Sequence, residues 1–240
     1  MKAFYKTDIG NVRKKNEDSI CFVEEKDFVL AAVADGMGGH RSGEIASQLA
    51  LESAEVFFKS NSEEILKDPK GFINKLFDYS CKKVYRMSTK METYEGMGTT
   101  MTLVVIDRIS MKAYFGNIGD SRAYLMMLDD IIQVTEDHTL VNEMYKKGQI
   151  TMEEFKNHPQ RNVLTKALGT CESVFPDYYQ IGLNRGTSIL LCSDGLSNYL
   201  TSNEIKELIM ENKEEAVDLL IEEAKNRGGT DNISAILIFN

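Results

Sequence analysis

The sequence has little of what divides a chain into domains or carries it into a membrane. It contains 3 prolines in 240 residues and no Ser/Gly-rich linker, internal repeat or low-complexity tract, so nothing in it predicts a domain boundary. Its longest apolar runs, such as residues 28–34, have the length of a strand, whereas a transmembrane helix needs roughly 20 apolar residues. The N-terminus also lacks the apolar run of a signal peptide. We therefore expect a single domain over residues 1–240, located in the cytoplasm and not inserted in a membrane.

Closely spaced cysteines and an excess of positive charge are also absent. No two of the 4 cysteines lie within twenty residues of each other, which argues against zinc knuckles, Cys-x-x-Cys redox pairs and dense disulfide frameworks. With 28 basic and 37 acidic residues, the net charge is -9. Nonspecific binding to nucleic acid depends on Lys and Arg neutralising phosphates, so we do not expect it here.

Three common motifs of phosphate chemistry are missing. No cysteine is followed six positions later by an arginine, as a cysteine-based phosphatase requires. No Asp-x-Asp occurs, which removes the aspartyl-phosphate route of haloacid-dehalogenase-type enzymes. No Gly-Lys dipeptide occurs, which removes the P-loop.

Hydrophobic periodicity predicts an α+β fold. Strands fall in two clusters and helices come in pairs, which indicates two antiparallel sheets covered by helices. A polar, helical segment at about 140–165 interrupts the strands and is a candidate surface flap. The other expected elements are an opening β region at 4–34 with strands at 19–23 and 28–34, strands at 99–106, 112–118, 123–128, 188–192 and 233–239, and helices at 42–59, 71–91, 202–210 and 213–227.

Carboxylates stand beside glycine at the ends of several predicted strands. Taken singly, an Asp-Gly after a strand is most simply a turn. Four such sites after separate strands are harder to explain as turns, because strand ends are where a rigid scaffold presents polar groups to a ligand. The residues concerned are Asp35, Asp120, Asp194 and Asp231, with Glu17 and Asp18 near the N-terminus.

Convergence of these carboxylates would require compensation of their charge. Carboxylates in one cleft repel each other, so protons or cations must offset the repulsion. All-oxygen ligands without Cys or clustered His favour Mg²⁺ or Mn²⁺ over Zn²⁺. Two such ions about 3.5 to 4 Å apart would activate a water and bind the oxygens of a phosphoryl group.

Six short motifs extend this pattern from one end of the chain to the other. They are residues 13–18 (RKKNED), 35–40 (DGMGGH), 98–100 (GTT), 116–122 (GNIGDSR), 193–196 (SDGL) and 229–232 (GTDN). In this order and spacing they resemble the motifs of the metal-dependent type-2C Ser/Thr protein phosphatases. Residues 158–169 (HPQRNVLTKALG) further resemble the small, single-domain bacterial members, which oppose Hanks-type protein kinases. The fold expected is a central sandwich of two antiparallel sheets flanked by pairs of helices, in four layers α-β-β-α, with a small helical flap.

The resemblance implies a role for each residue of a binuclear centre. Asp35 is expected to bridge two metal ions. Asp194 and Asp231 would complete the first site, and the carbonyl oxygen of Gly36 would serve the second. The implied cofactors are two or three Mn²⁺ or Mg²⁺ ions.

Further residues are assigned by the same resemblance. Glu17 would hold a water of the second ion, with Asp18 as a neighbour behind it. Asp120, together with Asp194, matches the position of a third, weaker metal. Arg13 matches the phosphate-binding arginine, whose planar fork suits two phosphoryl oxygens. His40 matches the proposed general acid, and its ordinary pKa of roughly 6.5 suits that task.

Local sequence leaves alternatives open for several residues. His40 is also placed to cap a helix that starts near Ser42, and Arg13 is also placed to be a solvated member of a basic run. Asn232 either positions its neighbour in the last motif or simply starts the last strand. His138 and His158 have no metal-type partner nearby, so surface or flap positions are expected for them. Cys192, within an apolar strand, is expected in the core.

The function expected is hydrolysis of phosphoserine and phosphothreonine on proteins. In the implied reaction, a water activated by the two ions attacks phosphorus without a covalent intermediate, while Arg13 and the ions offset the charge. Two alternatives are a catalytically silent phosphoprotein-binding module and a hydrolase of small phosphoesters. The implied partners are phosphorylated proteins, including a cognate Ser/Thr kinase, and a monomer is expected.

Overall fold

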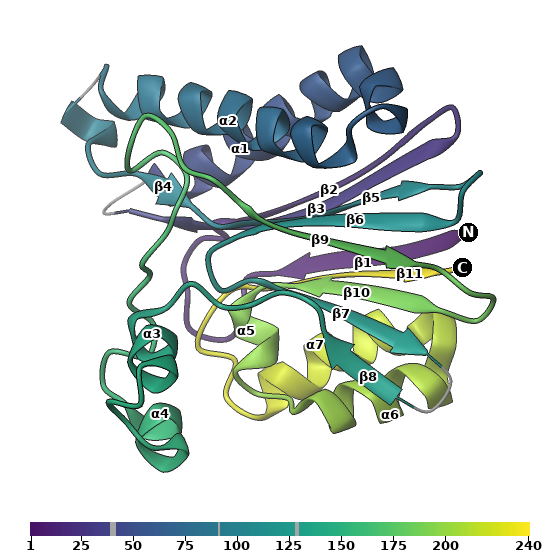
Figure 1. The fold of residues 1–240 in the computed structure, drawn as a ribbon. Coiled ribbons are helices and arrows are strands. Elements are labelled where there is room, and N and C mark those ends of the chain that lie inside the picture. The colour runs from purple at the N-terminus through teal and green to yellow at the C-terminus, as the bar shows by residue number, and fades with distance from the viewer. Residues whose placement is uncertain (39–41, 91, 128–129) are drawn as a thin grey trace.

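Two antiparallel sheets lie face to face in the centre of the protein, and a pair of helices covers the outer face of each (Figure 1). The computed structural model describes residues 1–38, 42–90, 92–127 and 130–240. The α+β class and the four layers α-β-β-α predicted from the sequence are confirmed. Within the described ranges, no helix combines the length and the apolar character that crossing a membrane requires.

The first sheet contains both ends of the chain. Its strand order is β1-β11-β10-β7-β8, and neighbouring strands run antiparallel. Helices α6 (Ser202–Asn212) and α7 (Ala216–Asn226) pack on its outer face (Figure 1). Its strands are β1 (Lys2–Asp8), β7 (Arg122–Met127), β8 (Asp130–Gln133), β10 (Ser188–Cys192) and β11 (Ile233–Phe239). The short helix α5 (Asp194–Ser197) follows β10, and a 3-10 turn (Lys213–Glu215) precedes α7.

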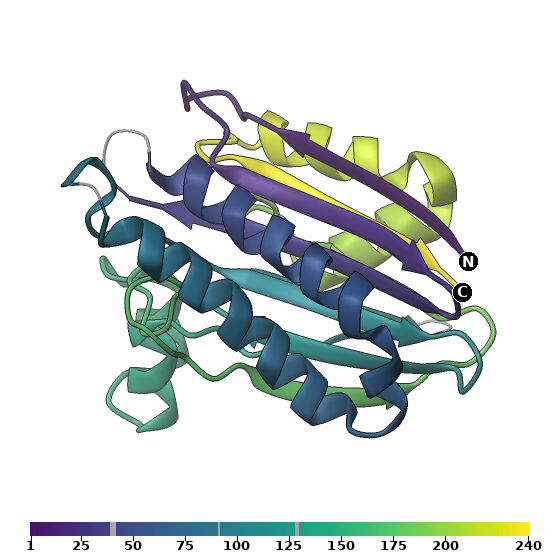
Figure 2. The same ribbon diagram turned by 90° about the horizontal axis from the view of Figure 1, so that it is seen from above.

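The second sheet has the order β2-β3-β5-β6-β9, with β4 paired to the end of β3. Helices α1 (Ser42–Asn61) and α2 (Pro69–Ser88) lie side by side across it, as the view from above shows (Figure 2). Its strands are β2 (Asp18–Glu25), β3 (Phe28–Met37), β4 (Gly98–Thr99), β5 (Met101–Asp107), β6 (Lys112–Ile118) and β9 (Asp177–Gly182). Two 3-10 turns, Ser62–Leu66 and Glu92–Tyr94, flank α2.

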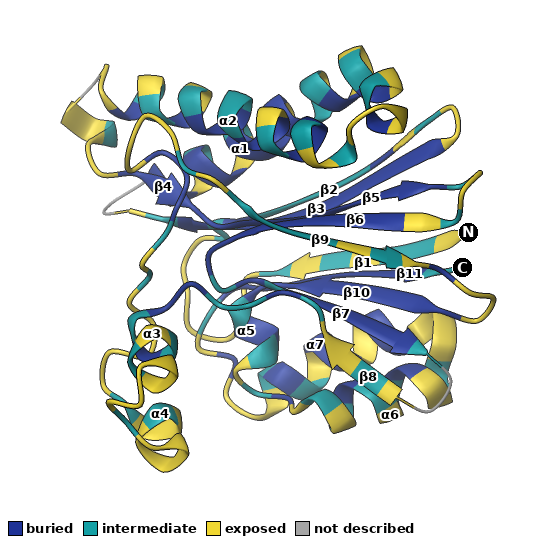
Figure 3. Ribbon diagram, in the orientation of Figure 1, coloured by how far each residue is buried: buried dark blue, intermediate teal, exposed yellow. Residues whose placement is uncertain are grey.

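The continuous apolar run of β3 reflects burial of both faces of its sheet. Successive residues of a strand point to opposite faces. Leu30 packs with Phe58 in the layer under α1 and α2, whereas Val29 and Val33 pack between the sheets with Ile236 of β11. Figure 3 shows the buried residues concentrated along the inner strands and the exposed ones on the outer sides of the helices. The strand ends, and the groups they present, are thus held by a rigid interior.

The expected flap projects from one end of the sandwich (Figure 1). It contains the short helices α3 (Leu140–Lys146) and α4 (Met152–Asn157), and α4 has no buried residue. A β-bridge between Thr139 and Leu164 closes its base. The helical segment predicted at 140–165 is therefore two short helices, and the remainder is not helical.

Some elements differ from the prediction. The edge strands β8 and β9 were not expected, because β8 has four residues without strong alternation and β9 is rich in half-exposed polar positions. The strand expected at 99–106 is divided at Thr100, which bonds to the end of β3. The helix expected at 213–227 begins at Ala216, after a 3-10 turn.

Candidate metal centre

An open cavity of about 370 Å³ collects the predicted site residues at one end of the two sheets. Each carboxylate comes from a separate connection: the end of β3, the turn after β6, the start of α5 and the turn before β11. The cavity is lined by Arg13, Glu17, Asp35, Gly36, Asp120, Asp194 and Asp231, together with Met37, Gly38, Thr100, Asn162 and Leu164. The carboxylates at the strand ends therefore do converge.

Asp18 lies behind the cavity rather than in its lining. It pairs with Asp35 across β2 and β3, and its side chain is buried. Its Oδ2 accepts hydrogen bonds from the hydroxyls of Ser193 and Ser234, each at 2.7 Å. Burial raises the pKa of Asp18 to about 7, against these two hydrogen bonds, which lower it.

Thr99 and Thr100 fix the backbone of Asp35. The Asp35 N–H donates to Thr100 Oγ1 at 2.9 Å, and the Asp35 carbonyl accepts from the Thr100 N–H at 2.9 Å. Thr99 Oγ1 also donates to this carbonyl, at 2.9 Å. These contacts supply the physical reason for two threonines after Gly98, which the sequence showed only as a motif.

Gly36 allows three segments to approach each other. A Cβ at this position would lie 2.1 Å from the carbonyl oxygen of Gly43 in the first turn of α1. The Gly36 N–H donates to the carbonyl of Glu17 at 3.1 Å. Because no side chain fits between these groups, a glycine is required here.

Asn232 holds the loop at residues 9–17 in place. Its Oδ1 accepts from the Glu17 N–H at 2.8 Å, and its Nδ2 donates to the carbonyls of Ile9 at 3.0 Å and Lys15 at 2.8 Å. Its own N–H donates to Asp231 Oδ1 at 2.8 Å. The side chain of Asn232 thus positions the N-terminal loop, and its backbone orients Asp231.

Arg13 is carried by this loop and faces the cavity. Its Nη2 donates to Asp231 Oδ2 at 2.7 Å, with both side chains partly exposed. It is therefore paired with a carboxylate of the site rather than solvated among its basic neighbours. Binding of phosphate by Arg13 stays a prediction.

The structure bears differently on the positions predicted for the three histidines. His40, the expected general acid, lies outside the described residues. His158 is half-buried at the end of α4, in keeping with a flap position. His138 is buried at the base of the flap. Of the two positions expected for it, surface or flap, the surface position was wrong. Cys192 is in the core, packed on the side of the first sheet that α6 and α7 cover.

The converging carboxylates perturb each other. Burial and then repulsion from Asp18 and Asp194 raise the pKa of Asp35 well above its ordinary value. Burial and repulsion from Asp194 likewise raise the pKa of Asp120. Asp194 Oδ1 is buried, and no described residue gives it a hydrogen-bond partner. A cavity that disfavours carboxylate charge and keeps an unpartnered carboxylate oxygen fits a hard divalent cation.

Not every feature of a metal site is preformed. Among the described residues, no group of three or more His, Cys, Asp and Glu side chains is arranged to hold a metal ion. Both oxygens of Asp231 are engaged, Oδ2 by Arg13 and Oδ1 by the Asn232 N–H. A cation on Asp231 would therefore have to share Oδ2 with the guanidinium of Arg13 or displace it.

Comparison with known proteins assigns the family. The family profile described as Protein phosphatase 2C matches residues 11–235. The chain belongs to the protein phosphatase 2C family. The resemblance found in the motifs is thereby confirmed, together with the enzyme class that it implied, a metal-dependent Ser/Thr protein phosphatase.

Relatives and solved structures resemble this protein phosphatase 2C chain over nearly its full length. Protein phosphatase PhpP of Streptococcus pneumoniae strain D39 is 34% identical over 97% of this chain and 94% of its own. The serine/threonine phosphatase structure from S. agalactiae has a TM-score of 0.92 and 33% identity, covering 100% of this chain and 99% of that one. The catalytic domain of PstP in complex with two manganese ions has a TM-score of 0.85 and 31% identity, covering 98% and 96%.

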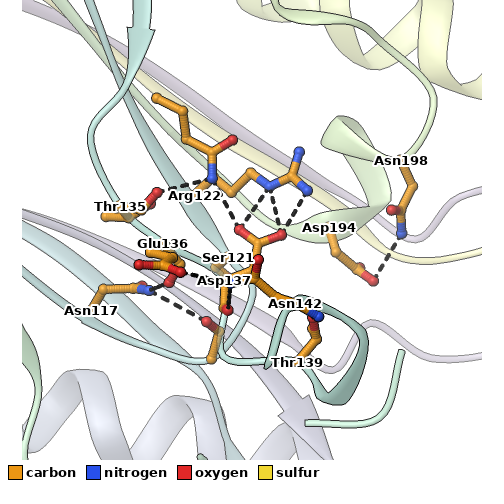
Figure 4. Close-up of polar contacts among 12 residues, drawn as sticks. Asn117, Ser121, Arg122, Thr135, Glu136, Asp137, Thr139, Asn142, Asp194 and Asn198 are labelled. Atoms are coloured by element: carbon orange, nitrogen blue, oxygen red, sulfur yellow. Dashed lines mark hydrogen bonds and ion pairs between the residues drawn. The ribbon is translucent and has the colours of Figure 1, made fainter. Parts of the chain in front are cut away.

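A second cavity of about 500 Å³ adjoins the first in this protein phosphatase 2C fold and shares Asp120, Asn162 and Asp194 with it. Arg122 and Asp137 lie in its wall, and Figure 4 shows their paired hydrogen bonds, Nε to Oδ1 at 2.9 Å and Nη2 to Oδ2 at 2.6 Å. The flap also contributes to this wall. The cavity therefore extends from the carboxylates to the flap.

Several residues of the site are not among those that the sequence predicts. Thr100, Asn162 and Leu164 line the first cavity, although none was named as a candidate. Thr100 lies in one of the six motifs, and the other two lie in the stretch at 158–169 that carried the resemblance to bacterial members. The motifs were thus the available signal for all three residues.

Proposed function

We propose that this protein hydrolyses phosphoserine and phosphothreonine on proteins with the help of two or three Mn²⁺ or Mg²⁺ ions. The observation that carries the proposal is the convergence of Asp35, Asp120, Asp194 and Asp231 with Arg13 in one open cavity. Family membership and the printed names of the relatives support the same reaction. A manganese complex of a similar structure supports the choice of ion.

Each ion would be bound by a different set of the acidic residues. Asp35 would contact two ions, Asp194 and Asp231 the first of them, and the Gly36 carbonyl the second. Glu17 would hold a water of that second ion, and Asp18 would be its buried neighbour behind the cavity. Bound ions would lower the pKa of a water and offset charge on phosphoryl oxygens.

Asp120 would hold a third ion together with Asp194. Asp194 Oδ1 has no hydrogen-bond partner in the described structure, which leaves it available as a ligand. Burial, followed by repulsion from Asp194 and Asp137, raises the pKa of Asp120, so a cation at this position would relieve that repulsion.

Arg13 would bind the phosphoryl group. Its guanidinium is planar and presents parallel donors that match two phosphoryl oxygens. In the structure it pairs with Asp231. A cation on Asp231 would weaken this pair and leave Arg13 available to the phosphoryl group, so cation and phosphate binding would support each other.

His40 would donate a proton to the departing Ser or Thr oxygen. An alkoxide is a poor leaving group, and general acid catalysis helps most where the leaving group is poor. His40→Ala is expected to lose much more rate on alkyl phosphoesters than on aryl phosphates. Equal losses on both would remove His40 from this role.

Turnover of a phosphothreonine peptide tests the proposed activity. The wild type should release phosphate in the presence of Mn²⁺ and stop when the metal is chelated. Asp35→Asn and Asp194→Asn, which keep the side-chain size, should lose nearly all of this activity, whereas Asp218→Asn on the exposed surface of α7 should retain it. No release by the wild type, or full release by Asp35→Asn, would end the proposal. Binding of the peptide without turnover would favour a silent binding module instead.

The substrates would be proteins phosphorylated by a cognate Ser/Thr kinase, and the enzyme would act as a monomer in the cytoplasm. The cavity that reaches the flap gives room for residues on either side of the phosphorylated one. Substitutions in the flap, such as Phe155→Ala, should change the ratio of rates between phosphopeptides of different sequence. Equal changes on all peptides would count against a role of the flap in substrate choice.

A further inference from the structure

His138 is a buried histidine that the proposed reaction does not use. It lies between the flap and the turn that carries Asp120. On the side of the flap, its carbonyl accepts the Thr165 N–H at 2.8 Å, directly beside the bridge that closes the base of the flap. On the other side it contacts Gly119, the residue before Asp120. Its position therefore joins two parts of the site that are separate in the sequence.

His138 bonds to both polar backbone groups of Gly119. The Gly119 N–H donates to His138 Nδ1 at 3.1 Å, and the Gly119 carbonyl accepts the His138 N–H at 2.9 Å. Gly119 packs closely against Thr100, since a Cβ at Gly119 would lie 2.5 Å from Thr100 Cβ, and its φ of +104° also suits glycine. Asn117 Nδ2 adds a longer bond to the Gly119 carbonyl, at 3.3 Å.

The imidazole is held in one orientation from its far side. Nδ1 accepts a hydrogen bond, so in the neutral ring the hydrogen is on Nε2, which lies 3.2 Å from Asp177 Oδ2. Lys166 Nζ bonds to the other oxygen of Asp177 at 3.0 Å and lies 3.2 Å from Nε2. Burial, followed by the charge of Lys166, lowers the pKa of His138, which favours the neutral ring that this geometry needs.

We propose that His138 is a positioning residue that fixes Asp120 for cation binding by clamping the Gly119 peptide to the base of the flap. The inference rests on the proposed role of Asp120 as a cation ligand. The Gly119 N–H is buried, so without an acceptor it has no ready replacement. Losing the clamp would let the turn at 119–120 move, and the cation would then bind a less ordered carboxylate.

Two substitutions test separately the contacts that the two ring nitrogens make. The amide oxygen of Asn reaches about where Nδ1 lies, so His138→Asn keeps the acceptor for Gly119 and loses the contact with Asp177. The amide of Gln reaches about where Nε2 lies, so His138→Gln keeps the contact with Asp177 and loses the acceptor. The proposal predicts that Asn preserves the function of His138 and that Gln does not.

Hydrogen exchange in the metal-free protein is the first readout. The Gly119 amide should exchange about tenfold faster or more in His138→Gln than in the wild type, and nearly normally in His138→Asn. Exchange at Leu190 in the core strand β10 serves as the internal reference for global stability. Equal acceleration at Gly119 and Leu190 in His138→Gln would mean a general loss of stability and would overturn the proposal.

Calorimetric titration with Mn²⁺ is the second readout. His138→Gln should bind Mn²⁺ about tenfold more weakly than the wild type, with phosphopeptide kcat approaching the wild-type value at saturating Mn²⁺. Unchanged Mn²⁺ affinity in His138→Gln, with binding intact in the wild type, would overturn the inference alone. Absence of Mn²⁺ binding by the wild type would instead refute the proposed function.

A measurement on the wild type covers the case in which His138→Gln fails to fold. The ¹⁵N chemical shifts of His138 report which ring nitrogen carries the hydrogen. The proposal requires hydrogen on Nε2 and a bare Nδ1 at pH 7. Hydrogen on Nδ1 would contradict it, because that nitrogen could not accept the Gly119 N–H.

Discussion

Replacing Asn232 by Ala should loosen the N-terminal loop that carries Arg13 and Glu17. Asn232 is only 3% exposed, and its side chain makes three hydrogen bonds to that loop. Alanine makes none of them. The Glu17 N–H and the carbonyls of Ile9 and Lys15 would then lose their partner at the same time.

The expected loss of stability follows from these three bonds. A typical hydrogen bond contributes about 0.5–1.5 kcal/mol net, and a buried group left unpaired costs about 1–3 kcal/mol. Because the loop is partly exposed and water can reach it, we expect Asn232→Ala to lower the free energy of unfolding by about 3 kcal/mol, the lower end of the sum for three unpaired groups. For a chain of this size, that corresponds to a fall of about 6–12 °C in Tm.

Chemical denaturation in metal-free buffer measures this effect without a contribution from cations. Asn11→Ala is the matched control, because the exposed Asn11 also donates from Nδ2 to two carbonyls, those of Lys225 at 2.7 Å and Gly228 at 3.0 Å. Asn11→Ala should lower the free energy of unfolding by less than about 1 kcal/mol, since water can replace the lost hydrogen bonds. Asn232→Ala should also raise the KM for a phosphopeptide through the displaced Arg13. Equal, small losses in the free energy of unfolding of both variants would refute the role of Asn232 in positioning this loop.

Three further predictions concern pH, backbone space and the flap. Since burial raises the pKa of Asp18 to about 7, the native protein binds more protons than the unfolded chain between about pH 4 and 7, so the metal-free Tm should fall as pH rises through this window. Asp18→Asn should reduce that slope but not abolish it, because burial also raises the pKa of Asp35 and of Asp120. An equal fall of Tm in the variant would show that Asp18 is not one of its causes. Gly119→Ala should destabilise the fold by more than about 2 kcal/mol in denaturant unfolding, because the new Cβ would lie 2.5 Å from Thr100 Cβ. Thr151→Ala removes the capping box of α4, so hydrogen exchange in α4 should accelerate while the global Tm stays within about 2 °C; a larger shift would show that α4 is coupled to the core.

The parts of the fold that follow from local pattern could be predicted from the sequence. The apolar run of β3 identifies a strand buried on both faces, and Asp35 at its end follows from the same pattern. Two antiparallel sheets covered by helices follow from paired helices between clusters of strands, whereas the order of the four layers came from the family resemblance. Carboxylates at several strand ends were enough to suggest a shared cation site, because strand ends meet at the edges of a sandwich.

Contacts between distant segments could not be predicted in this way. Asn232 and Lys15 are far apart in the chain, and nothing in the local sequence of either indicates their hydrogen bond. The buried clamp between His138 and Gly119 gives no local signal either, since a histidine before a polar segment reads as a surface residue. The ion pair of Arg13 with Asp231 likewise depends on the folding of both ends of the chain. These contacts are what orient the residues that the motifs identify.

Binding of divalent cations by the convergent carboxylates underlies every role proposed for this site. Calorimetric titration of Mn²⁺ into the metal-free protein, with Asp35→Asn measured in parallel, tests it most directly. The wild type should bind at least two ions saturably, and Asp35→Asn should lose most of that binding. No saturable binding by the wild type, or the same binding by both proteins, would contradict it.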